Sequence, residues 1–120
     1  TEPLRELLDA NQSISPDDPK HIGCVYAIGP AIMMKFCAAT TQPFNIKTIA
    51  SLNSVMIDGT GMCGGCRVRV GNESKFTCVD GPEFDAHQID WNLVLTRQKT
   101  YCEAEKCSLQ RYIAQTEGVR

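Results

Sequence analysis

The spacing of hydrophobic positions in the first half of the chain predicts a βαβ unit. Leu4, Leu7 and Leu8 fall on one helical face, and the apolar run that ends at Gly29-Pro30 is consistent with a buried parallel strand. Pro30 suits the start of a helix, where its missing N–H is not needed. The expected elements are a helix over 3–10, a loop over 11–20, a strand over 21–28, a helix over 31–39, a turn over 40–45 and a strand over 46–52. A crossover between two parallel strands would be right-handed.

Shorter periods mark the second half of the chain. Arg67-Val68-Arg69-Val70 alternates strictly, as a half-buried strand does, and the turn pair that follows leads to a partner strand. Asp90 is a residue type favoured at a helix N-cap. The expected elements are a loop over 53–66, a strand over 67–70, a partner strand over 74–77, a turn over 80–82, a helix over 91–98 and a last helix over 100–115 with Leu109, Tyr112 and Ile113 on its apolar face.

Four residues of the second half have the spacing of iron–sulfur ligands. Asp58, Cys63 and Cys66 repeat the Cys-x4-Cys-x2-Cys pattern of plant-type [2Fe–2S] sites with Asp in the first place, and Cys78 supplies a more distant ligand. The hairpin over 67–77 would carry Cys78 back toward Cys66. The glycines between these residues tolerate positive φ and let the backbone approach an anionic cluster. We therefore expect a [2Fe–2S] cluster held by three thiolates and one carboxylate, and electron transfer as its function.

Other interpretations of these residues are open. Zinc also binds Cys-x2-Cys pairs, although Cys78 stands alone and His87 is the only nearby His, so a zinc-stabilised docking domain without redox activity is the second hypothesis. A thioredoxin-like pair is disfavoured because the close cysteine pair does not open a helix after a strand, and a disulfide because the chain has the character of an intracellular protein. Asp58 could also serve only to bend the chain, since Asp-Gly is a common turn pair. Cys102 or Cys107 could then take its place as a ligand.

Composition narrows the class of protein. The 120 residues carry a net charge of −2 with no basic patch for nucleic acid. No apolar run approaches the ~20 residues that a membrane span needs, and no signal peptide is visible. Seven cysteines, an odd number in no regular framework, predict a reduced, cytoplasmic protein. Because the chain begins at Thr1 without Met, we expect a fragment of a longer polypeptide.

Two segments carry a family resemblance. Residues 25–34, Val-Tyr-Ala-Ile-Gly-Pro-Ala-Ile-Met-Met, resemble the ferredoxin–NADP reductase superfamily, in which a strand ends in Gly-Pro beside the nicotinamide. Residues 58–84 look like the iron–sulfur domain at the C-terminus of one branch of that superfamily. The branch includes the electron-transfer subunit of dihydroorotate dehydrogenase B and the small subunits of sulfide dehydrogenase and NADH-dependent ferredoxin:NADP oxidoreductase. Asp58 favours the latter two, which carry Asp where the first carries Cys, and residues 78–84 match their closing motif. The dihydroorotate dehydrogenase type is the third hypothesis.

The resemblance implies an α/β fold in two parts. Residues 1–53 would form the C-terminal half of a ferredoxin-reductase-type nucleotide-binding domain with parallel strands. Residues 54–120 would form a small [2Fe–2S]-binding domain with a β hairpin and a helical tail. The half domain would leave a sheet edge free, so we expect the chain to self-associate in isolation.

The resemblance also implies cofactors and a partner. Gly29, Pro30, Ala31 and Met33 would bind the nicotinamide end of NAD(P)H, although methionine at position 33 taken alone has the character of a core filler. The full-length subunit would bind FAD and NAD(P)H and pass electrons through the cluster to a large flavin and iron–sulfur subunit resembling the glutamate synthase small subunit, or to a hydrogenase module. Ile28 departs from the Cys that many of these reductases carry before Gly-Pro. The flavin-binding barrel and the glycine-rich pyrophosphate loop lie upstream in the family, so we expect this chain alone to be inactive.

Overall fold

The computed structural model describes residues 2–118 and has a mixed α/β architecture. Its elements in chain order are α1 (Glu2–Asn11), β1 (Cys24–Ile28), α2 (Ala31–Thr41), the 3₁₀ helix η1 (Gln42–Phe44), β2 (Lys47–Ser51), β3 (Arg67–Val70), β4 (Glu73–Phe76), α3 (Thr77–Asp80), β5 (Glu83–Asp85), α4 (Trp91–Gln98) and α5 (Cys102–Glu117). The sequence pattern predicts most of these within a few residues. It does not predict β5 or the single helical turn α3.

The main sheet contains the predicted βαβ unit. Strands β1 and β2 pair in parallel, with Cys24 opposite Lys47 and Ile28 opposite Ser51, and α2 connects them. Strand β5 then pairs with β2 in antiparallel orientation, with Phe84 opposite Ala50, which gives the strand order β1-β2-β5. Strands β3 and β4 form a separate antiparallel pair. The parallel strands confirm the predicted α/β class.

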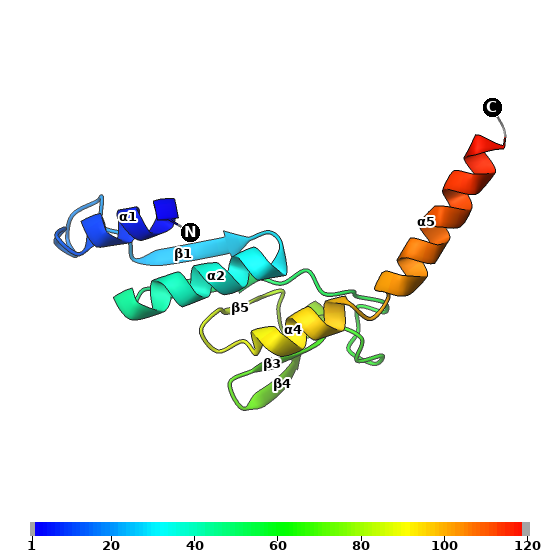
Figure 1. Ribbon diagram of the computed structural model, residues 1–120. Helices are drawn as coiled ribbons and strands as arrows, with labels where there is room; N and C mark the ends of the chain where they lie inside the picture. The colour runs from blue at the N-terminus through cyan, green and yellow to red at the C-terminus, as the bar shows by residue number, and fades with distance from the viewer. Residues whose placement is uncertain (1, 119–120) are drawn as a thin grey trace.

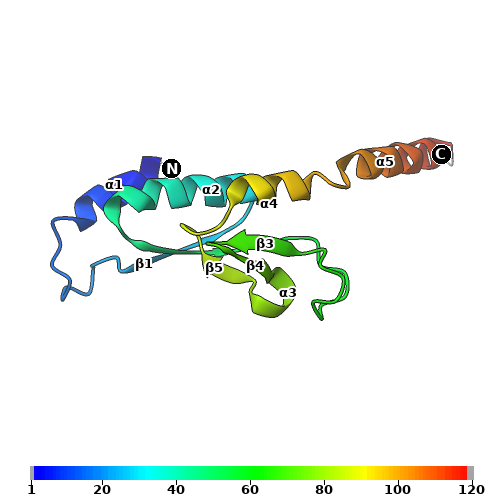
Figure 2. The ribbon, with the colours of Figure 1, turned by 90° about the horizontal axis from the view of Figure 1, so that it is seen from below.

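Helices cover only one face of the main sheet. Helices α1, α2 and α4 lie together on one side of the strands (Figure 2). On β1, Ala27 is buried beneath them, whereas Tyr26 and Ile28 on the opposite face are 61% and 71% exposed. The expectation of a buried strand over 21–28 is therefore wrong for Tyr26 and Ile28, and Ala27 is the one buried residue of β1. The apolar run does form a strand, but no second layer covers the outer face of β1 within residues 2–118.

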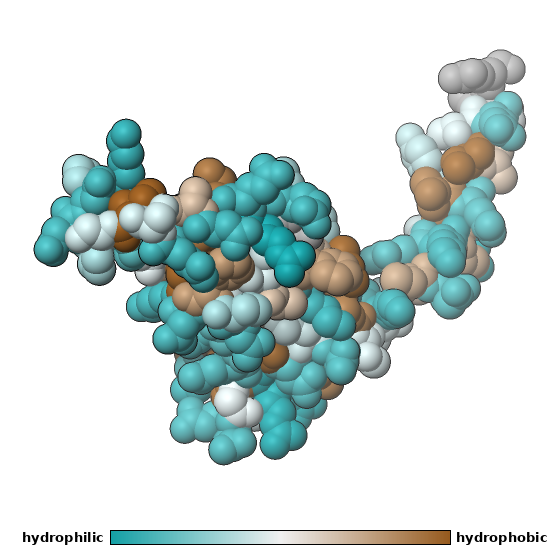
Figure 3. All heavy atoms as spheres, turned by 60° about the vertical axis from the view of Figure 1, so that its left-hand side comes forward, coloured by the Kyte–Doolittle hydropathy of each residue, from teal (hydrophilic) through white to brown (hydrophobic). Residues whose placement is uncertain are grey.

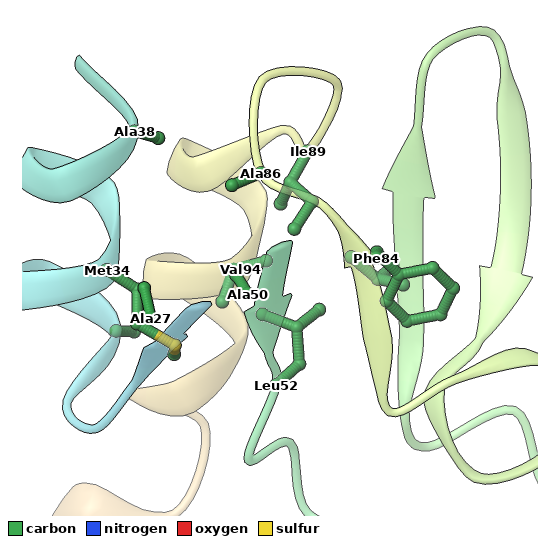
Figure 4. Packing of buried hydrophobic residues seen from close by; sticks show 11 residues of the cluster. Ala27, Met34, Ala38, Ala50, Leu52, Phe84, Ala86, Ile89 and Val94 are labelled. Atoms are coloured by element: carbon green, nitrogen blue, oxygen red, sulfur yellow. The ribbon is translucent and has the colours of Figure 1, made fainter. Parts of the chain in front are cut away.

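One hydrophobic core joins the two halves of the chain. Figure 4 shows Met34 of α2 and Ala50 of β2 in the same cluster as Val94 of α4. Met34 and Ala50 are fully buried. The remaining buried members are Ala27, Ala31, Ala38, Leu52, Val68, Phe84, Ala86 and Ile89. The core thus contains residues from both sides of position 53, and the expected division into parts 1–53 and 54–120 stays a prediction.

Helix α4 begins at the predicted N-cap. The Asp90 carboxylate accepts a hydrogen bond from the Leu93 N–H at 3.1 Å, which satisfies one of the free donors of the first turn. The backbone of Asp90 also donates to the Arg69 carbonyl at 2.9 Å, so the same residue ties α4 to β3. This connection places the helix beside the cysteine-containing segment.

Helix α5 projects away from the rest of the molecule (Figure 1). Its apolar residues Leu109, Tyr112 and Ile113 are all exposed, and the helix has no buried residue. Hydrophobic residues accordingly interrupt the hydrophilic surface of this arm as well as that of the main body (Figure 3). None of the described helices has the length and apolar character required to cross a membrane.

Candidate metal centre

The cysteine-containing loop runs from the end of β2 to the start of β3. It turns at glycines with positive φ, among them Gly61 at +83° and Gly64 at +65°, a conformation that is unfavourable for residues with a Cβ atom. A Cβ atom at Gly61 would also lie 3.0 Å from a methyl group of Val79. These two glycines therefore permit the tight path of the loop around its cysteines.

The hairpin of β3 and β4 brings two cysteines together. Cys66, which is buried, directly precedes β3, and Cys78 follows β4 in α3, so that their Sγ atoms lie 3.4 Å apart. The fully buried Thr77 fixes this arrangement, because its N–H and its hydroxyl both donate to the Cys66 carbonyl, at 3.2 and 2.8 Å. The expectation that the hairpin returns Cys78 to Cys66 is met.

Backbone N–H groups face two of the sulfur atoms of this segment. The Cys78 N–H lies 3.4 Å from Cys66 Sγ, and the Gly65 N–H lies 3.4 Å from Cys63 Sγ. The backbone of Gly61 acts to lower the pKa of Cys78. Inward-pointing N–H groups of this kind favour anionic sulfur. The sulfurs are thus surrounded as thiolate ligands of a metal cluster require.

The paired thiols Cys66 and Cys78 differ in their acidity. Burial raises the pKa of Cys66, but hydrogen bonds from the backbone and side chain of Cys78 outweigh burial, and the net effect lowers the pKa. The hydrogen bond to Cys66 raises the pKa of Cys78, and burial adds to this. Of the two thiols, Cys66 is therefore the more readily ionised.

Asp58 bonds to the backbone of the same loop. Its carboxylate accepts the Thr60 N–H at 3.1 Å and the Cys63 N–H at 2.8 Å, and these bonds lower its pKa to about 2. The carboxylate is therefore ionised and shapes the loop next to Cys63. Within residues 2–118, no three Cys, His, Asp or Glu side chains converge closely enough to hold a metal ion, so the loop positions Cys66 and Cys78 but not the full predicted set.

The alternative ligands lie elsewhere. His87 Nε2 is 2.9 Å from the Thr41 hydroxyl at the end of α2, and the Thr48 hydroxyl also donates to the Thr41 hydroxyl. This histidine therefore belongs to a hydrogen-bonded group with Thr41 and Thr48. Cys102 donates weakly to the Gln98 carbonyl at 3.8 Å, and Cys107 is exposed on α5. Within residues 2–118, none of these side chains hydrogen bonds to the cysteine loop.

The residues fit an iron–sulfur cluster in their chemistry. Thiolates are the ligands that such clusters require, and a carboxylate is a harder ligand that also binds iron. Cys63 and Asp58 are exposed. Their side chains can therefore rotate toward a cluster without displacing packed neighbours. The donor set therefore suits a [2Fe–2S] cluster, and the ligand assignment stays a prediction.

Three of the four residues expected to bind the nicotinamide share one hollow. Gly29, Pro30 and Ala31 line an open depression between the start of α2, α4 and the first residues of the cysteine loop. The rest of its lining comes from Ile32, Asn53, Val55, Leu95 and Gln98. Met33 instead packs against the core, with its Sδ 3.5 Å from Cys37 Sγ. The hollow thus connects the Gly-Pro turn with the first residues of the cysteine loop.

Two residues of the site were not singled out by the sequence. The sequence pattern predicts a strand at Thr77, and no adjacent residue in the sequence indicates that it hydrogen bonds to Cys66. Arg97 stands in the last turn of α4, where a basic residue is already favoured by the helix dipole. Its Nη2 donates to the Gly64 and Gly65 carbonyls at 3.4 and 3.0 Å, a contact across more than thirty residues of sequence that no local pattern indicates.

Comparison with known proteins supports the iron–sulfur assignment. Residues 53–90 match the iron–sulfur cluster binding domain of dihydroorotate dehydrogenase B. Over 88 residues the chain is 50% identical to a homologue of the electron transfer subunit of dihydroorotate dehydrogenase B (NAD⁺) from Thermotoga maritima, a match that covers 73% of this chain and 31% of the relative. It is also 57% identical over 74 residues to an uncharacterised protein encoded in the adh 3′ region of Clostridium beijerinckii, covering 62% of this chain and 25% of that protein.

A solved structure extends the likeness to nearly the whole chain. The structure of an NADH-dependent reduced ferredoxin–NADP oxidoreductase, studied for flavin-based electron bifurcation, superposes with a TM-score of 0.73 at 42% identity. The superposition covers 92% of this chain and 38% of that one. The chain therefore spans about a third of the length of the proteins it matches. These findings confirm the resemblance to FAD and [2Fe–2S] electron-transfer subunits of oxidoreductases.

Proposed function

We propose that this chain relays single electrons through a [2Fe–2S] cluster bound by Cys63, Cys66, Cys78 and Asp58. The observation that carries the proposal is the pairing of Cys66 and Cys78 at 3.4 Å, with backbone N–H groups directed at the sulfurs. When bound, the cluster supplies one-electron chemistry. The chain's own residues hold the ligands in place, and their N–H groups stabilise negative charge on the sulfurs.

The other end of the relay would be the hollow at the Gly29-Pro30 turn. We assign Gly29, Pro30 and Ala31 to the nicotinamide end of NAD(P)H, because they line the same depression as Asn53 and Val55 at the start of the cysteine loop. Met33 would act from the core behind Gly29, where a Cβ atom at the glycine would collide with it. In the full-length subunit, NAD(P)H and FAD would lie upstream of the cluster and supply its electrons.

The acceptor would be a second, larger subunit. Relatives are described as electron transfer subunits, which supports a partner protein. The loop exposes apolar side chains, as a docking surface would: Met62 is 89% exposed beside Cys63. Further exposed apolar residues in or next to the loop are Val55, Met56, Ile57 and Val79. We propose that the partner is a flavin and iron–sulfur subunit resembling the glutamate synthase small subunit, with a hydrogenase module as the second choice. The seven free cysteines favour a reducing compartment, so we place the complex in the cytoplasm.

Metal analysis of the protein purified without oxygen tests the relay. Two irons and two sulfides per chain, with an EPR signal after dithionite reduction, are expected for a [2Fe–2S] protein. Stoichiometric zinc without sulfide, persisting after reconstitution with iron and sulfide, would instead favour the zinc-stabilised docking domain and contradict the proposal.

Substitutions at Asp58 test the fourth ligand. Asp58→Cys should keep the cluster and change the EPR signal, because a softer ligand replaces oxygen. Asp58→Asn removes the carboxylate and keeps one oxygen, which can accept from either the Thr60 or the Cys63 N–H, whereas the two oxygens of Asp58 accept one each. A cluster in Asp58→Asn identical to the original in spectrum and iron content would show that Asp58 only shapes the loop.

A further inference from the structure

The last turn of α4 is bonded to both ends of the cysteine loop. Near the end of the loop, Arg97 Nη2 donates to the Gly65 carbonyl at 3.0 Å and to the Gly64 carbonyl at 3.4 Å. Near its start, Gln98 Nε2 donates to Asn53 Oδ1 at 2.9 Å. Two consecutive residues of one helix therefore fix the loop at the two points where it leaves the folded core.

We propose that Arg97 is the positioning residue of the cysteine loop and tunes the cluster that the loop holds. This inference rests on the proposed [2Fe–2S] function. The two carbonyls that Arg97 binds belong to the residues between Cys63 and Cys66. Holding these oxygens on the α4 side leaves the Gly65 N–H directed at Cys63 Sγ. Without Arg97, the Gly65 carbonyl would lose this donor and the Gly64 carbonyl would keep only the Arg67 N–H at 3.3 Å, so the turn would be less firmly held.

The helix that carries Arg97 is firmly packed. Helix α4 is capped at Asp90, and Val94, one turn before Arg97, is 4% exposed in the hydrophobic core. Arg97 and Val94 line the same small cavity between α4 and the loop, together with Ile57 and Gly65. Because the side chain extends from a packed helix rather than from a loop, its position is set by the core and transmitted to the cysteines.

The guanidinium also brings a positive charge that no carboxylate of residues 2–118 neutralises. Ion pairs among residues 2–118 join Lys75 to Glu73 and Lys106 to Glu103, and neither involves Arg97. A cation near the cluster favours its more negative, reduced form, since net charge and hydrogen bonding set the reduction potential. Arg97 should therefore raise the potential as well as order the loop.

Three variants separate position from charge. Arg97→Gln removes both the hydrogen bonds and the charge, whereas Arg97→Lys keeps the charge on a side chain one atom shorter. Arg69→Gln is the matched control, because Arg69 is an exposed arginine of the neighbouring strand β3 without a side-chain bond to the loop. The cluster-loaded proteins are compared by the rate of cluster loss to a chelator, by the midpoint potential and by the EPR line shape.

We expect Arg97→Gln to lose its cluster about tenfold faster than the original protein, the scale on which residues that orient metal ligands act. Its potential should shift to more negative values and its EPR lines should broaden. Arg97→Lys should recover the potential but not the retention. Equal retention and potential in Arg97→Gln and Arg69→Gln, or full recovery of retention by Arg97→Lys, would overturn the positioning role.

A measurement on the metal-free chain separates this inference from the proposed function. Absence of iron from the original protein would contradict the relay, but Arg97 would still hold the turn. The Arg67 amide donates to the Gly64 carbonyl at 3.3 Å, and its hydrogen exchange should then be about tenfold faster in Arg97→Gln than in Arg69→Gln, as expected when a local anchor is lost. Equal exchange in the two variants would overturn the role of Arg97 independently of any cluster.

Discussion

The main sheet and the cysteine loop are held in place by different forces. The sheet and its helices surround a core in which Met34 and Ala50 are fully buried, so side-chain burial fixes their arrangement. The loop has exposed apolar residues, and its conformation depends on hydrogen bonds such as those of Asp58 and Thr77. The first region can therefore fold without a ligand, whereas the second is shaped around groups that a ligand would complete.

Helix α4 belongs to both regions. Its Val94 is part of the core, while Arg97 and Gln98 bind the loop. The contrast with α5 is instructive, because α5 is longer yet has no buried residue. A helix that positions a site needs one side in the core and the other on the site, and only α4 meets both conditions in the described chain.

The largest expected effect is loss of the cluster without loss of the core. Cys78→Ala removes one proposed ligand, and iron and sulfide should fall to background because three ligands cannot hold the cluster stably. Far-UV circular dichroism should stay unchanged, since Cys78 is not a member of the hydrophobic core. Cys107→Ala, at an exposed position on α5, is the control and should keep full iron content. Equal iron content in the two variants would contradict the ligand assignment.

A core substitution should affect the opposite region. Met34→Ala removes a fully buried side chain and should lower the free energy of unfolding by about 2–5 kcal/mol, from lost burial and the cavity that remains. Urea unfolding of the metal-free chain measures this. Met62→Ala makes the same chemical change at a position that is 89% exposed in the loop and should leave the unfolding midpoint unchanged. Similar losses for both would mean that the loop contributes to the core.

A third substitution tests the backbone of the loop. Gly61→Ala introduces a Cβ atom at φ +83°, 3.0 Å from Val79, and should cost about 1–2 kcal/mol for the left-handed conformation alone. Gly23→Ala is the control, because nothing lies within 4 Å of its Cβ position. Urea unfolding of the cluster-loaded protein, followed by cluster absorbance, should register the loss for Gly61→Ala only. If both variants unfold alike, the turn at Gly61 is not required to hold the cysteines.

The sequence predicts the two regions unequally. The βαβ unit and the Asp90 cap follow from local periodicity and residue type, and the return of Cys78 to Cys66 follows from the hairpin. The pairing of β5 with β2 could not be predicted, because three residues show no periodicity and the contact depends on the fold of the remainder. The exposure of Tyr26 and Ile28 was missed for a related reason, since an apolar run does not reveal how many layers cover the strand.

The smallest predicted effect falls on both regions at once. Asp90→Ala removes the hydrogen bond to the Leu93 N–H and should lower the free energy of unfolding by about 1 kcal/mol, the usual contribution of an N-cap. Because α4 also holds the loop through Arg97, cluster loss to a chelator should be faster as well. Asp17→Ala removes an exposed carboxylate from the loop before β1 and serves as the control for charge. If Asp90→Ala lowers the unfolding free energy but leaves cluster retention at the level of Asp17→Ala, α4 stabilises the core without transmitting its position to the cysteines.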